Sequence, residues 1–144
     1  MRSARLLALP AVPLILALGA CAPTGWFDAV GSVTVPTGAS AEYVGLPCDE
    51  APADDASAAG DFSDIGEGTQ VVVENQDAET IASGALEAGT LVDEGGETLL
   101  CSYPFTLTKV PETAFYSILV GDGSRGGVQF TQEEMQNGPA IALQ

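Results

Sequence analysis

The chain has 144 residues, a formal net charge of −16 from 20 acidic and four basic side chains, and no histidine. This length fits one domain, and the charge argues against nucleic-acid binding, because phosphate contacts require clustered Lys and Arg. The lack of histidine removes the commonest general base and metal ligand, whereas a hydrophobic content of 46% is too high for a disordered acidic tail.

The first twenty residues have the pattern of an export signal. Two arginines precede an apolar run over residues 6–18, which is shorter than the roughly 20 residues that span a bilayer. The sequence LGAC at residues 18–21 resembles the bacterial lipobox. That resemblance implies cleavage before Cys21 and a diacylglycerol, with acyl chains such as palmitate, on its sulfur. An ordinary signal peptide followed by a coincidental cysteine is the alternative.

Cleavage divides the chain into a signal peptide (1–20), a lipidated cysteine with a short tether (21–29) and one folded domain (30–144). The exported chain keeps two cations and all 20 acids, a net charge of −18. Anionic headgroups repel such a chain, so the lipid on Cys21 must hold it at the membrane. Trp26 and Phe27 either enter the membrane interface or start the core, and the short tether favours the core.

Cys48 and Cys101 remain when Cys21 carries lipid, and an oxidising compartment favours one disulfide between them. Closing a loop of about 54 residues stabilises the fold by roughly 4 kcal/mol in the chain-entropy model. Two buried free thiols are the alternative. A zinc site is disfavoured, because two cysteines without histidine make a poor ligand set.

The exported chain is predicted to consist of short strands. Valines 30, 33 and 35 before Pro36 indicate a first strand, for which a sheet edge is one expected position, and residues 45–68 are predicted to form an acidic loop. Turns or loops are also expected at 75–78, 93–97 and 121–127. Further strands are expected at 69–74, 80–86, 99–110, 115–120, 128–130 and 140–143.

Residues 99–110 give the clearest strand signal, since apolar residues occupy alternate positions from Leu99 to Leu107. Pro104 cannot donate to a ladder, so an edge or a bulge is expected there. Thr131 and Glu134 form a capping box that predicts a short helix. The fold class is therefore an antiparallel β-sandwich of about seven strands, prealbumin-like or immunoglobulin-like, with one short C-terminal helix.

Several segments resemble known families. The NQD turn at 75–77, FTLTKVP at 105–111 and FYSI at 115–118 resemble prealbumin-like sandwiches, more narrowly carboxypeptidase regulatory-like modules. GDFSDI at 60–65 and GTQV at 68–71, with the C-terminal segment 130–143, resemble small acidic lipoproteins exported by actinobacteria. Both resemblances imply non-catalytic, export-associated domains and supply no catalytic residues.

Carboxylates crowd the loop between Cys48 and Gly68, and calcium binds six to eight oxygen ligands in flexible acidic loops. No spacing here matches an EF-hand, so a solvated acidic surface is favoured and a calcium-binding adhesive module is the alternative. The candidate ligands are Asp49, Glu50, Asp54, Asp55, Asp61, Asp64 and Glu67.

Three other patterns give little support for a catalytic or ligand site. The G-x-G-x-x-G sequence at 121–126 precedes a predicted strand rather than a helix, which favours a hairpin loop over a dinucleotide site. Paired carboxylates permit hydrolase chemistry but carry no specificity among 20 acids. Tyr103 and Phe105 are expected in the core, whereas Phe115 and Tyr116 point to opposite faces of one strand, so one of them must leave it.

The sequence therefore predicts a lipid-anchored, extracytoplasmic sandwich that acts as a binding or structural module without a cofactor. Its partners would be the membrane, through Cys21, and an envelope protein or other extracellular molecule. An interaction module of this kind predicts an exposed apolar patch or an open sheet edge. A carboxylate-dependent hydrolase is the least favoured hypothesis.

Overall fold

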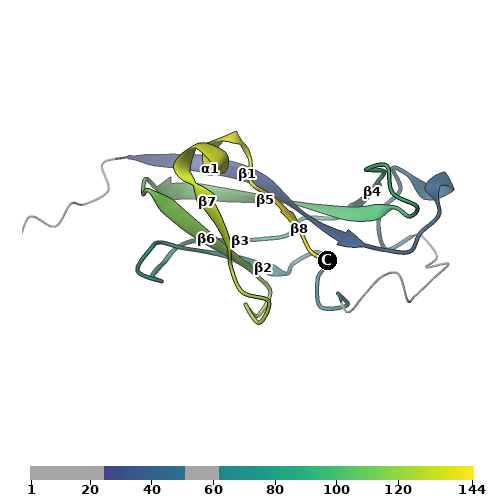
Figure 1. Ribbon diagram of the computed structural model, residues 1–144, viewed down its shortest axis with the longest axis horizontal. Coiled ribbons are helices and arrows are strands. Elements are labelled where there is room, and N and C mark those ends of the chain that lie inside the picture. Colours follow the sequence, from purple (N-terminus) through teal and green to yellow (C-terminus); the bar gives the residue numbers. More distant parts are fainter. Residues whose placement is uncertain (1–24, 51–61) are drawn as a thin grey trace, which may run out of the picture.

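The computed structural model describes residues 25–50 and 62–144, and these form a sandwich of two four-stranded sheets (Figure 1). Sheet A has the order β4-β5-β1-β8, and sheet B has the order β3-β2-β6-β7. The strands of sheet A are β1 (Trp26–Pro36), β4 (Thr90–Val92), β5 (Leu100–Pro111) and β8 (Ala140–Ala142). Those of sheet B are β2 (Gln70–Glu74), β3 (Thr80–Ala85), β6 (Phe115–Val120) and β7 (Val128–Thr131). A 3₁₀ turn, η1 (Ala41–Tyr43), and one short helix, α1 (Gln132–Asn137), complete the described elements.

The predicted all-β sandwich with a short C-terminal helix is confirmed. The described residues hold eight strands rather than about seven, because the three-residue β4 was not predicted. β1 begins at Trp26, four residues before the expected start of the domain. β1 is also not an edge strand, since it lies between β5 and β8.

The strand order is that of immunoglobulin-type sandwiches. From β1 to β7, the strands occupy the positions called B, C, C′, D, E, F and G in that architecture. β8 lies beside β1 where strand A would be, but it comes from the end of the chain and runs parallel to β1. The prealbumin-like variant is not confirmed and stays a prediction.

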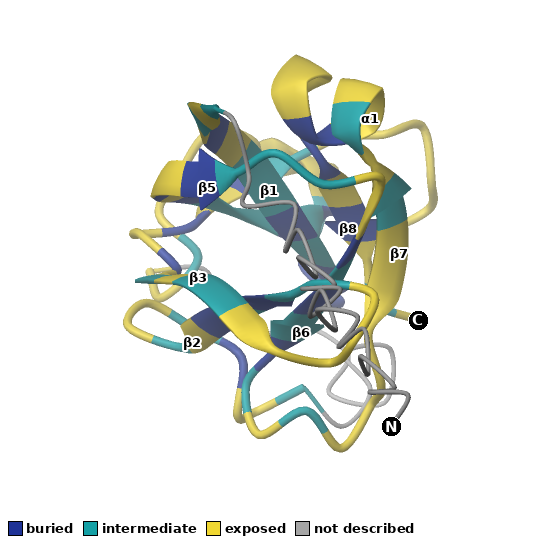
Figure 2. Ribbon diagram, turned by 90° about the vertical axis from the view of Figure 1, so that its left-hand side faces the viewer, coloured by how far each residue is buried: buried dark blue, intermediate teal, exposed yellow. Residues whose placement is uncertain are grey.

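The core lies between the sheets and is built from alternate strand positions. Figure 2 shows the buried residues mainly along the strands and most of the loops exposed. Alternation places every second side chain of a strand on the inner face, where it leaves water. Within the described residues no polar or charged side chain is buried. The largest buried side chains are Tyr116, Phe105, Leu86, Leu91, Leu99, Leu107, Ile118 and Met135.

Pro104 lies in a central strand, not at a sheet edge, and no bulge occurs at it. Opposite Pro104 in β1 is Ser32, whose N–H points away from β5 and donates to the Pro139 carbonyl at 3.0 Å. The proline nitrogen therefore faces the other side of β5, where β4 does not reach, because its first residue, Thr90, pairs with Ser102. There the Pro104 carbonyl accepts from the Glu87 N–H at 2.8 Å.

The irregularity of β5 lies instead near its C-terminal end, at Lys109. The pairing of β1 with β5 shifts between Phe27 and Ala29, and Lys109 has a positive φ of 55°. The Asp28 carboxylate accepts the Lys109 N–H at 2.9 Å and so satisfies the displaced backbone. This shift ends the alternation of β5 after Leu107 and returns Val110 to the core.

Helix α1 connects β7 of sheet B to β8 of sheet A, and its Met135 is fully buried. The predicted capping box is confirmed, because the Thr131 hydroxyl accepts the Glu134 N–H and the Glu134 carboxylate accepts the Thr131 N–H. This carboxylate is held by the Thr131 N–H and hydroxyl, which lower the pKa of Glu134. The box therefore fixes where the chain leaves sheet B.

Candidate functional site

A shallow groove of about 360 Å³ lies on sheet B at the end of the sandwich where β1 begins. Its floor contains a row of side chains from three neighbouring strands: Glu74 pairs with Ser117, and Ser117 pairs with Gln129. Ser117 lies between the buried Tyr116 and Ile118, so this row is on the outer face of the sheet. The groove is lined by Glu74, Asn75, Gln76, Ala78, Phe115, Tyr116, Ser117 and Gln129.

One wall of the groove is the turn between β2 and β3, which was predicted at 75–78. The Asn75 side-chain oxygen accepts the N–H groups of Asp77 and Glu79 at 2.9 and 3.0 Å, as asparagines do in turns. Its amide nitrogen also donates to the Glu79 carboxylate at 3.0 Å. Ala78 has a φ of 58°, a strained value for alanine that these hydrogen bonds hold in place.

The corner between β5 and β6 positions the opposite wall. The Tyr116 hydroxyl donates to the Pro111 carbonyl at 3.0 Å and accepts the Thr113 N–H at 2.9 Å. The Tyr116 ring also meets the Phe27 ring edge-on, with 6.0 Å between centroids. Such a tyrosine corner locks the chain as it crosses from one sheet to the other. The corner consequently fixes the position of Phe115, which immediately precedes Tyr116 and points to the outer face of the sheet.

Several groups in the groove have no partner within the described part of the chain. The side chains of Gln76, Ser117 and Gln129 make no hydrogen bond to other described residues, and Phe115 is 55% exposed. The exposed ring offers an apolar contact, and the amides and hydroxyl beside it, which no other described residue engages, offer directional hydrogen bonds of the kind that orient a ligand. These groups are equipped to recognise a ligand by packing and hydrogen bonding.

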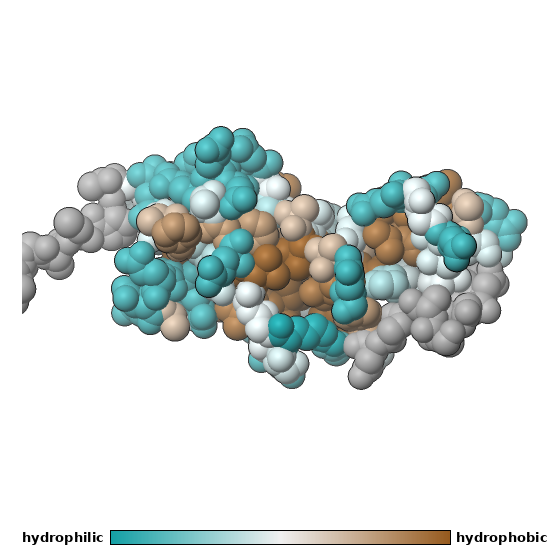
Figure 3. Space-filling view, viewed as in Figure 1, coloured by the Kyte–Doolittle hydropathy of each residue, from teal (hydrophilic) through white to brown (hydrophobic). Residues whose placement is uncertain are grey.

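The sheet surfaces are almost uncharged, although the protein is strongly acidic. Within the described strands the charged residues are Asp28, Glu74 and Lys109, and the other described charges lie in loops, turns and α1. Figure 3 shows the side of the sandwich where the edge strands β7 and β8 lie, with hydrophobic surface over the middle of the molecule and hydrophilic groups around it. A partner that contacts a sheet face therefore displaces few hydrated charges.

The aromatic residues divide as the sequence predicted. Phe105 is fully buried and Tyr103 packs partly buried against the core, where burial and then the nearby Asp49 raise its pKa. Of the pair in β6, Tyr116 is in the core and Phe115 is outside it. The preference for Trp26 and Phe27 in the core is half right: Phe27 packs against it, whereas Trp26 is 67% exposed.

The four predicted calcium ligands that the structure describes are not gathered into one cluster. Asp49 and Glu67 line one small hollow of about 190 Å³ beside Cys48, while Glu50 is exposed. Asp64 is bound to Arg125 instead. In residues 25–50 and 62–144, no three or more Cys, Asp or Glu side chains are grouped to hold a metal ion. The remaining candidates, Asp54, Asp55 and Asp61, lie outside the described residues, so calcium binding stays a prediction.

The glycine-rich segment 121–126 is confirmed as a loop that joins β6 to β7 and precedes a strand. Arg125 in this loop binds both carboxylate oxygens of Asp64, at 2.6 and 2.7 Å, and lies 5.4 Å above the Phe62 ring. The Arg125 guanidinium consequently holds the pKa of Asp64 below its ordinary value. This contact fastens the loop before β2 to the hairpin after β6.

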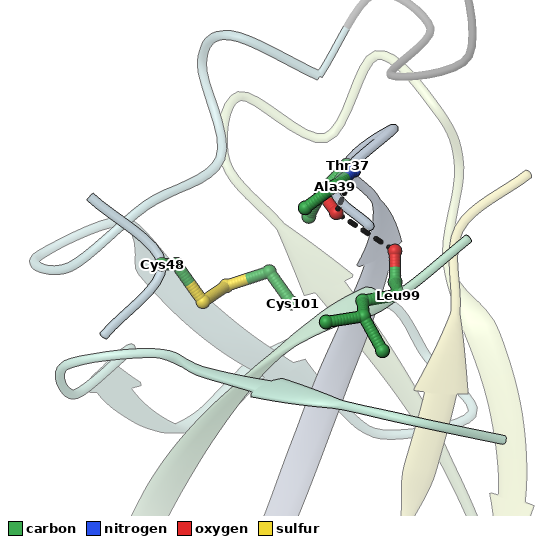
Figure 4. Close-up of a disulfide and its surroundings, with 5 residues drawn as sticks. All are labelled: Thr37, Ala39, Cys48, Leu99 and Cys101. Carbon is green, nitrogen blue, oxygen red and sulfur yellow. Dashed lines mark hydrogen bonds between the residues drawn. A yellow bond between two sulfur atoms is a disulfide. The ribbon is translucent and has the colours of Figure 1, made fainter. Parts of the chain in front are cut away.

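The expected disulfide joins Cys48 and Cys101, whose Cα atoms are 5.8 Å apart (Figure 4). It connects the loop that follows η1 to the start of β5. Beside it, the Thr37 hydroxyl donates to the Leu99 carbonyl at 2.7 Å and accepts the Ala39 N–H at 3.1 Å. This end of the sandwich is therefore held by a covalent bond and by a threonine hydroxyl that bonds to two backbone groups, one of them 62 residues away.

Comparison with protein families, characterised proteins and solved structures finds no match to this chain. Cys21 and the leader lie outside the described residues, and among those described no helix is long and apolar enough to cross a membrane. The groove was not predicted from the sequence. Ser117 and Gln129 are outward positions of strands that were predicted, but their alignment with Glu74 depends on strand pairing, for which the sequence carries no direct signal.

Proposed function

We propose that this chain is an exported lipoprotein, held at the membrane by lipid on Cys21, whose sandwich is a non-catalytic binding module facing the extracytoplasmic side. The observation that carries the binding function is the groove at Phe115, where an exposed ring lies beside the side chains of Ser117 and Gln129, which make no hydrogen bond to other described residues. The lipobox-like sequence at 18–21 supports the anchor.

The charge distribution supports a neutral or basic partner. Loops with many carboxylates surround sheet faces that carry almost no charge, so acidic molecules are repelled before they reach the groove. At the groove itself, amide and hydroxyl groups select the partner by hydrogen bonds, and Phe115 supplies apolar contact. An envelope protein or another extracytoplasmic molecule with such a surface fits this role.

The anchor is tested by cell fractionation of the Cys21→Ser variant together with metabolic labelling by an alkyne fatty acid. We expect label on the unaltered chain, no label on the variant, and release of the variant from the membrane fraction. Two acyl chains give stable anchoring at about 0.8 kcal/mol per buried methylene, so their loss leaves an acidic chain without a holding force. A variant that stays in the membrane fraction contradicts the anchor.

The binding face is tested by a photo-crosslinking amino acid placed at Gln129, in the groove, in intact cells. The matched control places it at Thr106, an exposed position in β5 of sheet A. We expect a discrete adduct from Gln129 that disappears in the Phe115→Ala background, and no such adduct from Thr106. Identical adducts from both positions, or none from Gln129, would count against the groove as the contact surface.

A further inference from the structure

We propose that Trp26 lies in the interface of the membrane that holds Cys21, so that the end of the sandwich where β1 begins faces the bilayer. This inference rests on the proposed lipid anchor and adds an orientation to it. Phe27 is turned toward the Tyr116 ring in the core, and the next side chain back, Trp26, is consequently directed outward and is 67% exposed. Among the described large hydrophobic residues it is the most exposed.

The short stretch of chain between Trp26 and Cys21 identifies the surface that this exposed ring contacts. Four residues lie between Cys21 and Trp26, so the two are five steps apart along the chain and at most about 18 Å apart when it is fully extended. A lipid in the bilayer therefore keeps Trp26 close to the headgroups. Tryptophan favours that layer, because its ring is apolar and its indole N–H can still reach water or headgroup oxygens.

The surroundings of Trp26 determine which membrane surface suits it. Val30 is 62% exposed, and at alternate positions it shares the side of β1 that carries Trp26. Asp28 lies between them, but its carboxylate accepts the Lys109 N–H. The Glu112 carboxylate lies close to Gly25 at the same end. Because the exported chain carries a charge of −18, we expect a zwitterionic surface to take up Trp26 better than an anionic one.

The chain itself provides the reporter and the attachment point. Trp26 is the single tryptophan, and Cys21 is the one cysteine of the exported chain that the disulfide does not use. The chain from Cys21 onward can thus be coupled through its thiol to maleimide-bearing phosphatidylcholine vesicles. We expect Trp26 emission to shift to shorter wavelength and to be quenched by a nitroxide lipid labelled near the headgroup. Both effects should weaken when phosphatidylglycerol is added.

A matched control moves the attachment to the other end of the sandwich, in a Cys21→Ser, Gln144→Cys variant. Gln144 follows β8, whose Ala142 pairs with Thr34 of β1. Thr34 is eight residues along β1 from Trp26, which corresponds to about 26 Å. We expect free-protein emission and no quenching from this variant. Trp26 emission that is equally quenched in both coupled forms, or in neither, overturns the proposal.

A Val30→Asp variant coupled through Cys21 sharpens the test, and we expect reduced quenching because a charge then faces the headgroups. Quenching equal to that of the unaltered chain contradicts a contact that includes this side of β1. Chemical coupling does not depend on lipidation in the cell. The orientation can therefore fail while the fractionation experiment confirms the anchor, and the coupled chain can still insert Trp26 into the vesicle when that experiment rejects the anchor, so the two failures are distinguishable.

Discussion

The two ends of the sandwich are held in different ways. At the end where β1 begins, short connections are fixed by side chains that bond to backbone, chiefly Tyr116 and Asn75. At the other end, longer connections are held by the disulfide of Cys48 and by the ion pair of Arg125 (Figure 1). Where the connections between strands are long, bonds between residues far apart in the sequence take the place of hydrogen bonds within a turn. At the end that is fixed by local contacts, the outward side chains are not needed to hold the connections, and several of them line the groove.

The largest expected effect comes from removing the disulfide in a Cys48→Ala, Cys101→Ala variant. The lost bond closes a loop of about 54 residues, so we expect the free energy of unfolding to fall by roughly 4 kcal/mol. Urea unfolding followed by far-ultraviolet circular dichroism measures this loss. The Cys21→Ser variant, which keeps the disulfide, is the control. A stability equal to that control would show that the noncovalent contacts suffice at this end.

At the groove end the corresponding change is Tyr116→Phe, which deletes one hydroxyl and keeps the buried ring. The Pro111 carbonyl and the Thr113 N–H each lose a partner, and we expect a loss of about 2 kcal/mol. Tyr103→Phe is the matched control, because the Tyr103 hydroxyl makes no hydrogen bond to other described residues. Equal unfolding free energies for the two variants would contradict the assigned role of the corner.

The sequence predicted most strands because alternation is a local signal. Residues 99–107 alternate strictly, and the observed β5 follows that pattern up to Leu107. The bulge at Lys109 was missed, because it depends on Asp28, a residue 81 positions away that accepts the Lys109 N–H. The edge or bulge expected at Pro104 was wrong for a related reason: a proline lacks only the N–H, and no β4 residue lies opposite its nitrogen because β4 begins at Thr90, opposite Ser102.

The groove was harder to predict than the strands that form it. The Asn75 turn and the capping box at Thr131 are local motifs, and both are confirmed. The row from Glu74 to Gln129, however, requires the registers of two strand pairs at once. A shift of either register by one residue would turn the row toward the core, and composition does not determine which register forms.

A smaller loss is expected at the groove end from Thr131→Ala, which removes the hydroxyl that caps α1. The Glu134 N–H then lacks its acceptor, and N-cap substitutions of this kind cost about 1 kcal/mol. Urea unfolding measures the change, and Thr108→Ala is the control for losing a threonine, because Thr108 is exposed in β5 and its hydroxyl makes no hydrogen bond to other described residues. If both variants are equally stable, the box positions the chain without stabilising it.

The smallest effect, and the one with a distinctive pH dependence, is expected from Asp64→Asn at the disulfide end. The Arg125 guanidinium lowers the pKa of Asp64 from its ordinary 3.8, so the ion pair stabilises the fold above the unfolded-state pKa and stops doing so as pH falls through the folded-state pKa. The urea midpoint of the variant should therefore lie below that of the unaltered chain near pH 7, and this difference should vanish in acid.

Asp77→Asn is the control for Asp64→Asn, because it removes the same charge from a turn and breaks no ion pair among the described residues. Losing one carboxylate from a chain this acidic relieves repulsion in both variants, so the difference between them isolates the contact with Arg125. A gap between their urea midpoints that closes below pH 4 assigns part of the stability of this end to the ion pair. Identical midpoints at every pH would leave the disulfide as the link that holds it.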